Sequence, residues 1–485
     1  MSQAKHLRIA VIGAGASGIA AAIKLREIGV EDVVVFEKAA ELGGTWRENT
    51  YPGLICDVPS HLYRFSFAPN PDWSHRYSPG SEIQAYMKDV ARRFDVERLI
   101  RFSSEVTGAA YENGAWRIAT TQGDEGLFDA VITAAGVLHH PNYPDIEGLS
   151  DFAGVAFHTA RWDHGVSLKG KRVGIIGTGS TATQILPAIV DEVAHVSLFQ
   201  RTAQWVMADI NPPVPEEKKA QYRADPASLE DRFHRLAEVF NSTFCAAVAG
   251  ENPEAYATIA QACEDNLETN VHDPALREKL RPNYKVGCKR LVVSGVFYPA
   301  LQQDNAELVT EGIARIEPTG VRTADGRLHA LDVLVLATGF NPHRFFRPMG
   351  VTGRGGLSLD QAWSGANIAY RGVSVPGFPN WFMLGGPNSP IGNFSFLMTV
   401  EHQLNYVLQL VALLRDGRAR EIAATPESTA VYNDALKAKM AGSIWASGCN
   451  SWYIDKNGAV ASYPWSYETF ERDMNAPVLE DYELV

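Results

Sequence analysis

Two stretches of the chain repeat one pattern of hydrophobic and polar positions: an apolar run, a glycine-rich turn, an apolar-rich segment and a second apolar run. The first is RIAVIGAGASGIAAAIKL at residues 8–25, followed by VVVFE at 33–37. The second is KRVGIIGTGSTATQIL at residues 171–186, followed by HVSLFQRT at 195–202. Short continuous apolar runs are typical of strands buried on both faces, and each segment between them has the length of a helix. The pattern predicts two β-α-β units with parallel sheets.

The rest of the chain is organised around these two units. Residues 98–136 contain short strand-like runs with turns at Asn113-Gly114 and Gly123-Asp124, which predict a β-meander. Residues 208–287 change to helical periodicity, and residues 396–415 predict one long helix. We therefore expect an α/β fold with two Rossmann-like dinucleotide-binding domains and a helical insertion. The expected division is 1–147 and 365–485 for the first domain, 148–207 and 288–364 for the second, and 208–287 for the insertion.

The first glycine turn has the spacing of a dinucleotide-binding motif, G-x-G-x-x-G. Gly13 would make the tight turn, Gly15 would let the backbone approach a pyrophosphate, and Gly18 would let helix and strand pack closely. Ser17 belongs to the same turn. Glu37 lies 24 residues after Gly13, where an acid receives ribose hydroxyls, so this unit predicts a site for FAD or NAD. The same segment also imitates a secretory signal peptide, but the glycine spacing explains it better.

The second glycine turn differs from the first at two informative positions. It runs Gly177-x-Gly179-x-x-Ala182, and the residue 24 places after Gly177 is Arg201 instead of an acid. A guanidinium suits a 2′-phosphate, so this unit predicts NADP. The alternative for Arg201 is a solvated surface arginine. Two such sites together imply that a hydride passes from NADPH to a bound flavin.

Residues 43–57, GGTWRENTYPGLICD, follow the first unit and combine glycines with an aromatic ring and a closing acid. Beside a flavin, we expect Trp46 and the turn at Tyr51-Pro52-Gly53 to line the flat isoalloxazine. We expect Asp57 to face the charge that develops there. The alternative for Trp46 is plain core packing.

Composition narrows the classes of function. The 485 residues include 44 basic and 56 acidic side chains, and the net charge of −12 argues against a nucleic-acid partner. No uninterrupted apolar stretch reaches the roughly 18 residues that predict a membrane span. Five cysteines stand singly without a C-x-x-C pair, so we expect neither a disulfide framework nor a zinc site, and a reducing cytoplasm fits best. We expect no metal site among the thirteen histidines.

Together these spacings resemble the class B flavoprotein monooxygenases, and more narrowly the Baeyer-Villiger monooxygenases. The run Phe152-x-Gly154-x-x-x-His158-x-x-x-Trp162-Asp163 is similar to the fingerprint that this family carries between its glycine motifs. Residues 43–57 resemble its second fingerprint. The related N- and S-oxygenating flavin monooxygenases usually lack the Trp-Asp pair, so Trp162-Asp163 favours the ketone-oxidising branch. Residues 208–287 match nothing in the family, which leaves the substrate open.

The resemblance implies a set of site residues. The implied flavin contacts are Glu37, Thr45, Trp46, Asp57, Tyr63, Val106 and Phe396. The implied NADP contacts are Thr178, Gly179, Ser180, Gln184, Arg201, Thr202 and Lys289. The implied active-site arginine is Arg290, and we expect His158 to have a structural role between domains. The chain departs from the pattern at Ala182 and at Ala134-Ala135-Gly136.

The chemistry implied is oxidation of a ketone to an ester or lactone with NADPH and O₂. Reduced flavin and O₂ would give a C4a-peroxyflavin, and Arg290 would stabilise its anion and the later oxyanion because a guanidinium keeps its proton. Asp57 would orient Arg290 and offset its burial. The alternative is that Lys289-Arg290 is a solvated basic pair.

Three other functions stay open. One is N- or S-oxygenation by a flavin-containing monooxygenase. A disulfide reductase would need a cysteine pair, which the missing C-x-x-C argues against. A flavin-binding protein without catalysis is the third. The ketone and the oligomeric state are open as well.

Overall fold

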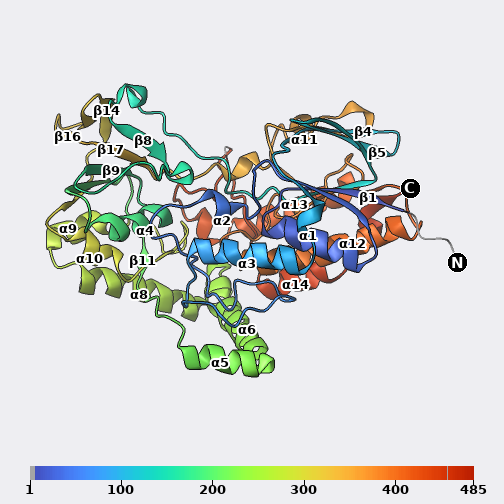
Figure 1. The fold of residues 1–485 in the computed structure, drawn as a ribbon, viewed down its shortest axis with the longest axis horizontal. Coiled ribbons are helices and arrows are strands. Elements are labelled where there is room, and N and C mark those ends of the chain that lie inside the picture. Colours follow the sequence, from blue (N-terminus) through green and yellow to red (C-terminus); the bar gives the residue numbers. More distant parts are fainter. Residues whose placement is uncertain (1–5, 456) are drawn as a thin grey trace.

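The computed structural model describes residues 6–455 and 457–485. It places two lobes side by side, each built around a five-stranded parallel sheet (Figure 1). The strand order is β19-β7-β1-β2-β3 in the first sheet and β13-β10-β9-β17-β8 in the second. All pairings within both sheets are parallel. The expected α/β fold with two Rossmann-like units is confirmed.

The first unit covers its parallel sheet with helices that bury small and branched side chains. Helix α1 starts at the glycine turn, buries Ala20, Ala21 and Ala22 completely and packs against α12, the long helix expected over 396–415. The strands of this sheet are β1 (Arg8–Ile12), β2 (Asp32–Phe36), β3 (Ile100–Arg101), β7 (Ala130–Thr133) and β19 (Trp381–Met383). The helices are α1 (Ala16–Glu27), α2 (Thr45–Glu48), α3 (Gly80–Arg93) and α12 (Phe396–Arg415).

A second, four-stranded sheet in the first unit confirms the expected meander. Its order is β18-β4-β5-β6, and Asn113 and Gly114 turn the first hairpin with positive φ angles of 50° and 89°. The strands are β4 (Val106–Glu112), β5 (Ala115–Thr120), β6 (Gly123–Phe128) and β18 (Gly350–Thr352). Because β18 pairs with β4, and α11 (Leu359–Ala362) packs beside it, the chain returns to the first unit before the expected boundary at residue 364.

The second unit repeats the arrangement of the first. Helix α4 follows the second glycine turn and packs on α10, and a small antiparallel sheet of order β14-β15-β16 closes the outer end. The parallel strands are β8 (Val155–His158), β9 (Arg172–Ile176), β10 (His195–Phe199), β13 (Ala306–Val309) and β17 (Val333–Leu336). The other elements are α4 (Ser180–Ile189), α10 (Phe297–Leu301), β14 (Ile313–Glu317), β15 (Gly320–Thr323) and β16 (Leu328–Ala330).

The helical insertion lies below and between the two sheets, with α5 and α6 projecting at the lower edge (Figure 1). Arg64 of the first unit is fully buried, pairs with Glu230 at 2.5 Å and lies over the ring of Phe233, so the insertion is anchored to the first unit. The helices are α5 (Glu216–Ala224), α6 (Pro226–Phe240), α7 (Ala246–Val248), α8 (Pro253–Asn270) and α9 (Pro274–Leu280). Two short strands, β11 (Val206–Met207) and β12 (Val292–Val293), pair at its two ends.

The C-terminal elements complete the first unit, and the described part of the chain begins and ends at the same edge of the molecule (Figure 1). These elements are β20 (Ile422–Ala424), α13 (Pro426–Met440), α14 (Tyr467–Asn475) and β21 (Tyr482–Leu484). Helix α14 packs on α12, and β20 pairs with β21.

Candidate active site between two nucleotide units

The two glycine turns have the same backbone geometry. Gly13 has a φ angle of 108° and Gly177 one of 110°. A Cβ at Gly13 would lie 2.6 Å from the carbonyl oxygen of Ala134, and one at Gly177 would lie 2.4 Å from that of Ala337. Only glycine fits such contacts. Each turn leads into the first turn of α1 or α4, whose free N–H groups can receive a pyrophosphate.

Glu37 lies directly after β2, next to the first turn. Its carboxylate accepts hydrogen bonds from the backbone N–H groups of Ala14 and Ala39, both at 2.8 Å. Ser17 is buried in α1 in the same turn. The residues around this turn therefore fit the adenine nucleotide of FAD, with a carboxylate fixed beside the ribose position.

In the second unit, two cationic side chains lie close to each other beside the glycine turn. Arg201 is exposed directly after β10, and Lys289 is half-buried opposite it. Burial and the charge of Arg201 lower the pKa of Lys289. Within the described part of the chain neither side chain forms an ion pair, and Lys289 lies over the ring of Tyr284 at 4.9 Å, so both can bind an anion such as a 2′-phosphate. Thr178 donates from Oγ1 to the carbonyl of Thr202 at 2.8 Å, which fixes the turn beside them.

The stretch 43–57 divides between the two units. Trp46 donates from Nε1 to the hydroxyl of Tyr63 at 3.1 Å, and the two rings meet edge to face. Tyr51 donates to Oε1 of Gln184 on α4 at 3.1 Å, and Gln184 donates to the carbonyl of Ile55 at 3.1 Å. A Cβ at Gly53 would lie 2.3 Å from the carbonyl oxygen of Gln184. The turn at 51–53, which we expect to line the flavin, also packs against α4, where only a glycine lets the two backbones approach so closely.

Asp57 ends this stretch and binds Arg290. Nε and Nη2 of Arg290 donate to Oδ2 of Asp57 at 3.0 and 2.5 Å, and Nη1 donates to the carbonyl of Gly392 at 3.1 Å. Burial, the largest single effect, would lower the pKa of Arg290, but the charge and hydrogen bonds of Asp57 together with the neighbouring Tyr453 and Cys56 raise it. The side chains of Arg290 and Asp57 stay 31% and 25% exposed, so a reactant can reach them. The predicted pair thus forms one fixed cation held by three hydrogen bonds.

Two further residues at Arg290 were missed from the sequence. A Cβ at Gly392 would lie 2.4 Å from the hydroxyl of Tyr453 and 3.1 Å from Nη1 of Arg290, so these groups converge. Burial raises the pKa of Tyr453 to about 12, which keeps its hydroxyl protonated. The aromatic-rich sequence around Trp452 was the only signal, and it did not indicate a contact across 163 residues.

A disulfide between Cys288 and Cys449 corrects the expectation of unpaired cysteines. The two positions are separated by 161 residues, whereas inspection of spacing finds only cysteines that are close in sequence. Cys56, Cys245 and Cys263 are free and buried. Burial raises the pKa of the Cys56 thiol, so it stays protonated beside Asp57.

Three other predicted residues are held by packing or by hydrogen bonds within the protein. His158 is fully buried, accepts at Nδ1 from the N–H of Ala160 and bonds through Nε2 to the carbonyl of Gly339 at 3.0 Å, as expected for a linker residue. Burial lowers its pKa, so it is neutral. Val106 is buried in β4. Phe396 packs on Gly385, which follows β19 at the same sheet edge as Gly13.

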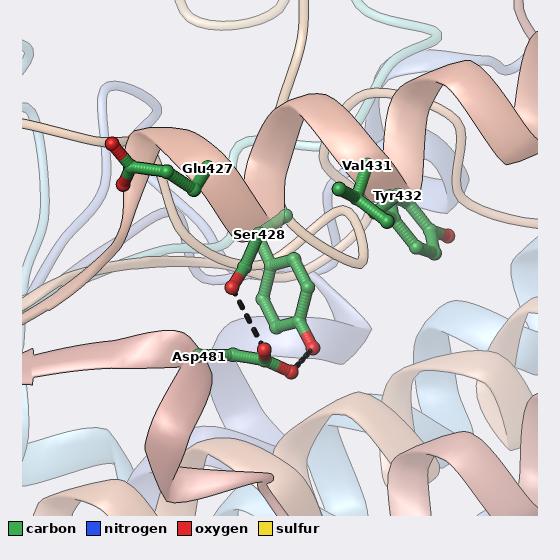
Figure 2. A pocket seen from close by; sticks show the side chains of 6 residues that line it. Glu427, Ser428, Val431, Tyr432 and Asp481 are labelled. Atoms are coloured by element: carbon green, nitrogen blue, oxygen red, sulfur yellow. Dashed lines mark hydrogen bonds between the residues drawn. The ribbon is translucent and has the colours of Figure 1, made fainter.

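A surface pocket of about 350 Å³ contains none of the predicted site residues (Figure 2). It is lined by α13 and the C-terminal segment, and Asp481 accepts hydrogen bonds there from Ser428 at 2.7 Å and from Tyr370. Over residues 6–455 and 457–485, no three side chains are grouped to hold a metal ion. In the same residues, every helix is too short or too polar to cross a membrane.

Comparison with known proteins identifies the family. Residues 6–215 match the family described as Flavin-binding monooxygenase-like. An uncharacterized monooxygenase of Mycobacterium tuberculosis is 45% identical over 459 residues, which cover 94% of this chain and 92% of the relative. A Baeyer-Villiger monooxygenase of Streptomyces coelicolor is 38% identical over 486 residues, which cover 99% of this chain and 93% of the relative. The crystal structure of OTEMO in complex with FAD and NADP matches with a TM-score of 0.89 at 26% identity, covering 100% of each chain. The protein belongs to the Baeyer-Villiger monooxygenases, a family of FAD- and NADP-dependent flavin monooxygenases.

Proposed function

We propose that the protein oxidises a ketone to an ester or lactone. In the overall reaction, ketone, O₂, NADPH and a proton give ester, water and NADP⁺, so one oxygen atom enters the product and the other leaves as water. The observation that carries the proposal is the fixed pair of Arg290 and Asp57 between the two nucleotide units. FAD, when bound, supplies the activated oxygen, expected from the sequence to be the C4a-peroxyflavin.

The roles of the chain's own residues follow from their chemistry. Attack on a carbonyl carbon needs a nucleophilic, anionic oxygen and then creates an oxyanion on the substrate. Arg290 can stabilise both negative charges, because its raised pKa keeps the guanidinium charged throughout. Asp57 holds the guanidinium in place. We assign Arg201 and Lys289 to the 2′-phosphate of NADPH, and Glu37 to the FAD ribose.

N- or S-oxygenation is the alternative, and it needs an electrophilic oxygen that a neighbouring cation does not favour. The test is product analysis with NADPH under air, with a ketone and a thioether supplied in parallel. We expect ester from the ketone at a higher yield per NADPH than sulfoxide from the thioether. Sulfoxide with no ester from cyclic, linear or aryl ketones would contradict the proposal.

A further inference from the structure

The disulfide joins the two segments that meet at Arg290. Cys288 lies two residues before Arg290 in the loop 281–291 between α9 and β12, and Cys449 lies four residues before Tyr453. We call residues 447–455 the tail segment. We propose that Cys288–Cys449 is a thiol-disulfide modification site that positions Tyr453 on Arg290 and so controls oxygen transfer. This inference rests on the function proposed for Arg290.

Among the described residues, the Tyr453 side chain bonds to Arg290, but no backbone hydrogen bond joins the tail segment to the Arg290 loop. Its backbone bonds close within the C-terminal region: the N–H of Ile454 donates to the carbonyl of Ser451, and the N–H of Ala461 donates to the carbonyl of Tyr453. Loops without a ladder of hydrogen bonds to their neighbours open locally at low cost. A covalent link between positions 161 residues apart keeps the two loops at high effective concentration.

Tyr453 acts in this arrangement as a positioning residue. It is 2% exposed, its hydroxyl lies beside the guanidinium of Arg290, and the ring of Trp452 stacks on its ring at 4.3 Å between centroids. The tail segment therefore adds a contact to those that Asp57 and Gly392 make with Arg290. Without the contact from Tyr453, Arg290 would stay charged but its guanidinium would be free to move toward either side of Asp57.

The bond is open to exchange from one side. Cys288 is fully buried, whereas Cys449 is half-buried between the exposed Gly448 and Asn450. A dithiol reductant can attack Sγ of Cys449, forming a mixed disulfide and releasing the Cys288 thiolate beside the cationic Lys289. The second thiol of the reductant then displaces Cys449, so the protein gains two thiols and the reductant becomes a disulfide. In reverse, hydrogen peroxide oxidises both thiols to the disulfide and is reduced to two waters.

Reduction should affect one half of the catalytic cycle. The two glycine turns, at 13–18 and 177–182, are far in sequence from both cysteines, so saturating NADPH should still reduce the flavin at its usual rate. The KM for NADPH can change, because Lys289 is the neighbour of Cys288. Ester formed per NADPH should fall on the order of tenfold, because small misplacements of a catalytic group are costly, and hydrogen peroxide should rise in compensation.

The experiment compares the holoenzyme with and without a phosphine reductant. Mass spectrometry of a non-reducing digest should first show the peptides of Cys288 and Cys449 joined. Flavin reduction, ester and hydrogen peroxide are then measured in both states. The matched control is Cys449→Ser, which keeps all three free cysteines, should behave like the reduced protein and should not respond to reductant. Absence of the joined peptide, or an ester yield that reduction leaves unchanged, would overturn the proposal.

A second readout does not depend on ester formation. Hydrogen exchange of residues 447–455 should become several-fold faster on reduction, while exchange in α1 stays the same. If the oxidised protein makes no ester from any ketone, the proposed function fails. The exchange measurement still shows whether the disulfide holds the tail segment in place. Unchanged exchange in 447–455 would overturn the proposal that the disulfide holds the tail segment.

A variant of Tyr453 tests its positioning role. Tyr453→Phe should lower the ester yield, while the pH dependence of that yield stays as in the wild type, since Arg290 keeps its proton.

Discussion

The two nucleotide sites differ chemically in a few charged side chains. Glu37 places a carboxylate beside the first turn, and Arg201 takes the equivalent place in the second unit with Lys289 opposite. A carboxylate repels a 2′-phosphate and accepts ribose hydroxyls, whereas two unpaired cations attract the phosphate. In the proposed assignment, the choice of coenzyme at each site is set by residues outside the shared glycine turns.

Replacing Arg201 with alanine should therefore weaken NADPH and leave NADH nearly unaffected. Removing one charged hydrogen bond costs about 1.5 to 3 kcal/mol, so we expect the KM for NADPH to rise about 10- to 100-fold. Steady-state kinetics with both coenzymes measure this. Arg418→Ala, which removes another exposed arginine after α12, is the control and should change neither KM. An undiminished preference for NADPH in Arg201→Ala would contradict the assignment.

The proton on Lys289 gives a second prediction. Its pKa is lowered by burial and by Arg201, so the free protein releases this proton at a lower pH than an ordinary lysine with a pKa of about 10.4. A bound 2′-phosphate would restore the proton. NADP⁺ binding should therefore take up protons at alkaline pH, and its affinity should fall as the pH rises through this interval.

Calorimetry in two buffers of different ionisation enthalpy measures that proton uptake. NAD⁺, which lacks the 2′-phosphate, should bind without it. Lys289→Met should abolish the uptake with NADP⁺. Equal uptake in the wild type and in Lys289→Met would assign the proton to another group.

At the scale of elements, the sequence predicted what local spacing determines. The strand-turn-helix units, the meander and the long helix over 396–415 follow from periodicity within one segment. The turn at 51–53, the contact of Tyr453 with Arg290 and the disulfide follow from packing between segments that are far apart in the chain. Nothing in the periodicity of either partner indicates such a contact. The pair of Asp57 and Arg290 was predicted because the family resemblance, and not the pattern, linked the two positions.

The packing of Gly53 on α4 makes a testable contrast. Gly53 and Gly114 have similar φ angles of 78° and 89°, but a Cβ at Gly53 would meet the carbonyl of Gln184 at 2.3 Å and one at Gly114 would meet nothing within 4 Å. Gly114→Ala should cost about 1 kcal/mol of stability from backbone strain alone. Gly53→Ala should cost about 2 to 4 kcal/mol, because overpacking adds to the strain.

Thermal unfolding and flavin reduction by NADPH measure both effects. We expect Gly53→Ala to lower Tm by several degrees more than Gly114→Ala and to slow flavin reduction, since the turn aligns the two nucleotide units. Equal losses in the two variants would show that the contact with α4 has no role in stability.

At the scale of the whole molecule, the proposed function divides the reaction between the two nucleotide units and the single cation of Arg290. The parallel sheets place their glycine turns in separate lobes (Figure 1), and Arg290 reaches from the second unit to Asp57 of the first. Hydride transfer needs only the two nucleotide sites. Oxygen transfer to a carbonyl needs the fixed positive charge as well.

Replacing Arg290 is the most direct test of this division. Arg290→Ala should bind FAD and be reduced by NADPH, while ester formation falls by about 10² to 10³, the usual loss for one electrostatic contact in a transition state. Arg290→Lys should not restore it, because an ammonium cannot keep both hydrogen bonds to Asp57 in one plane. The measurement is anaerobic stopped-flow reduction, followed by mixing with O₂ and a ketone and chromatography of the product. Ester formation by Arg290→Ala at close to the wild-type rate would show that oxygen transfer does not depend on this charge.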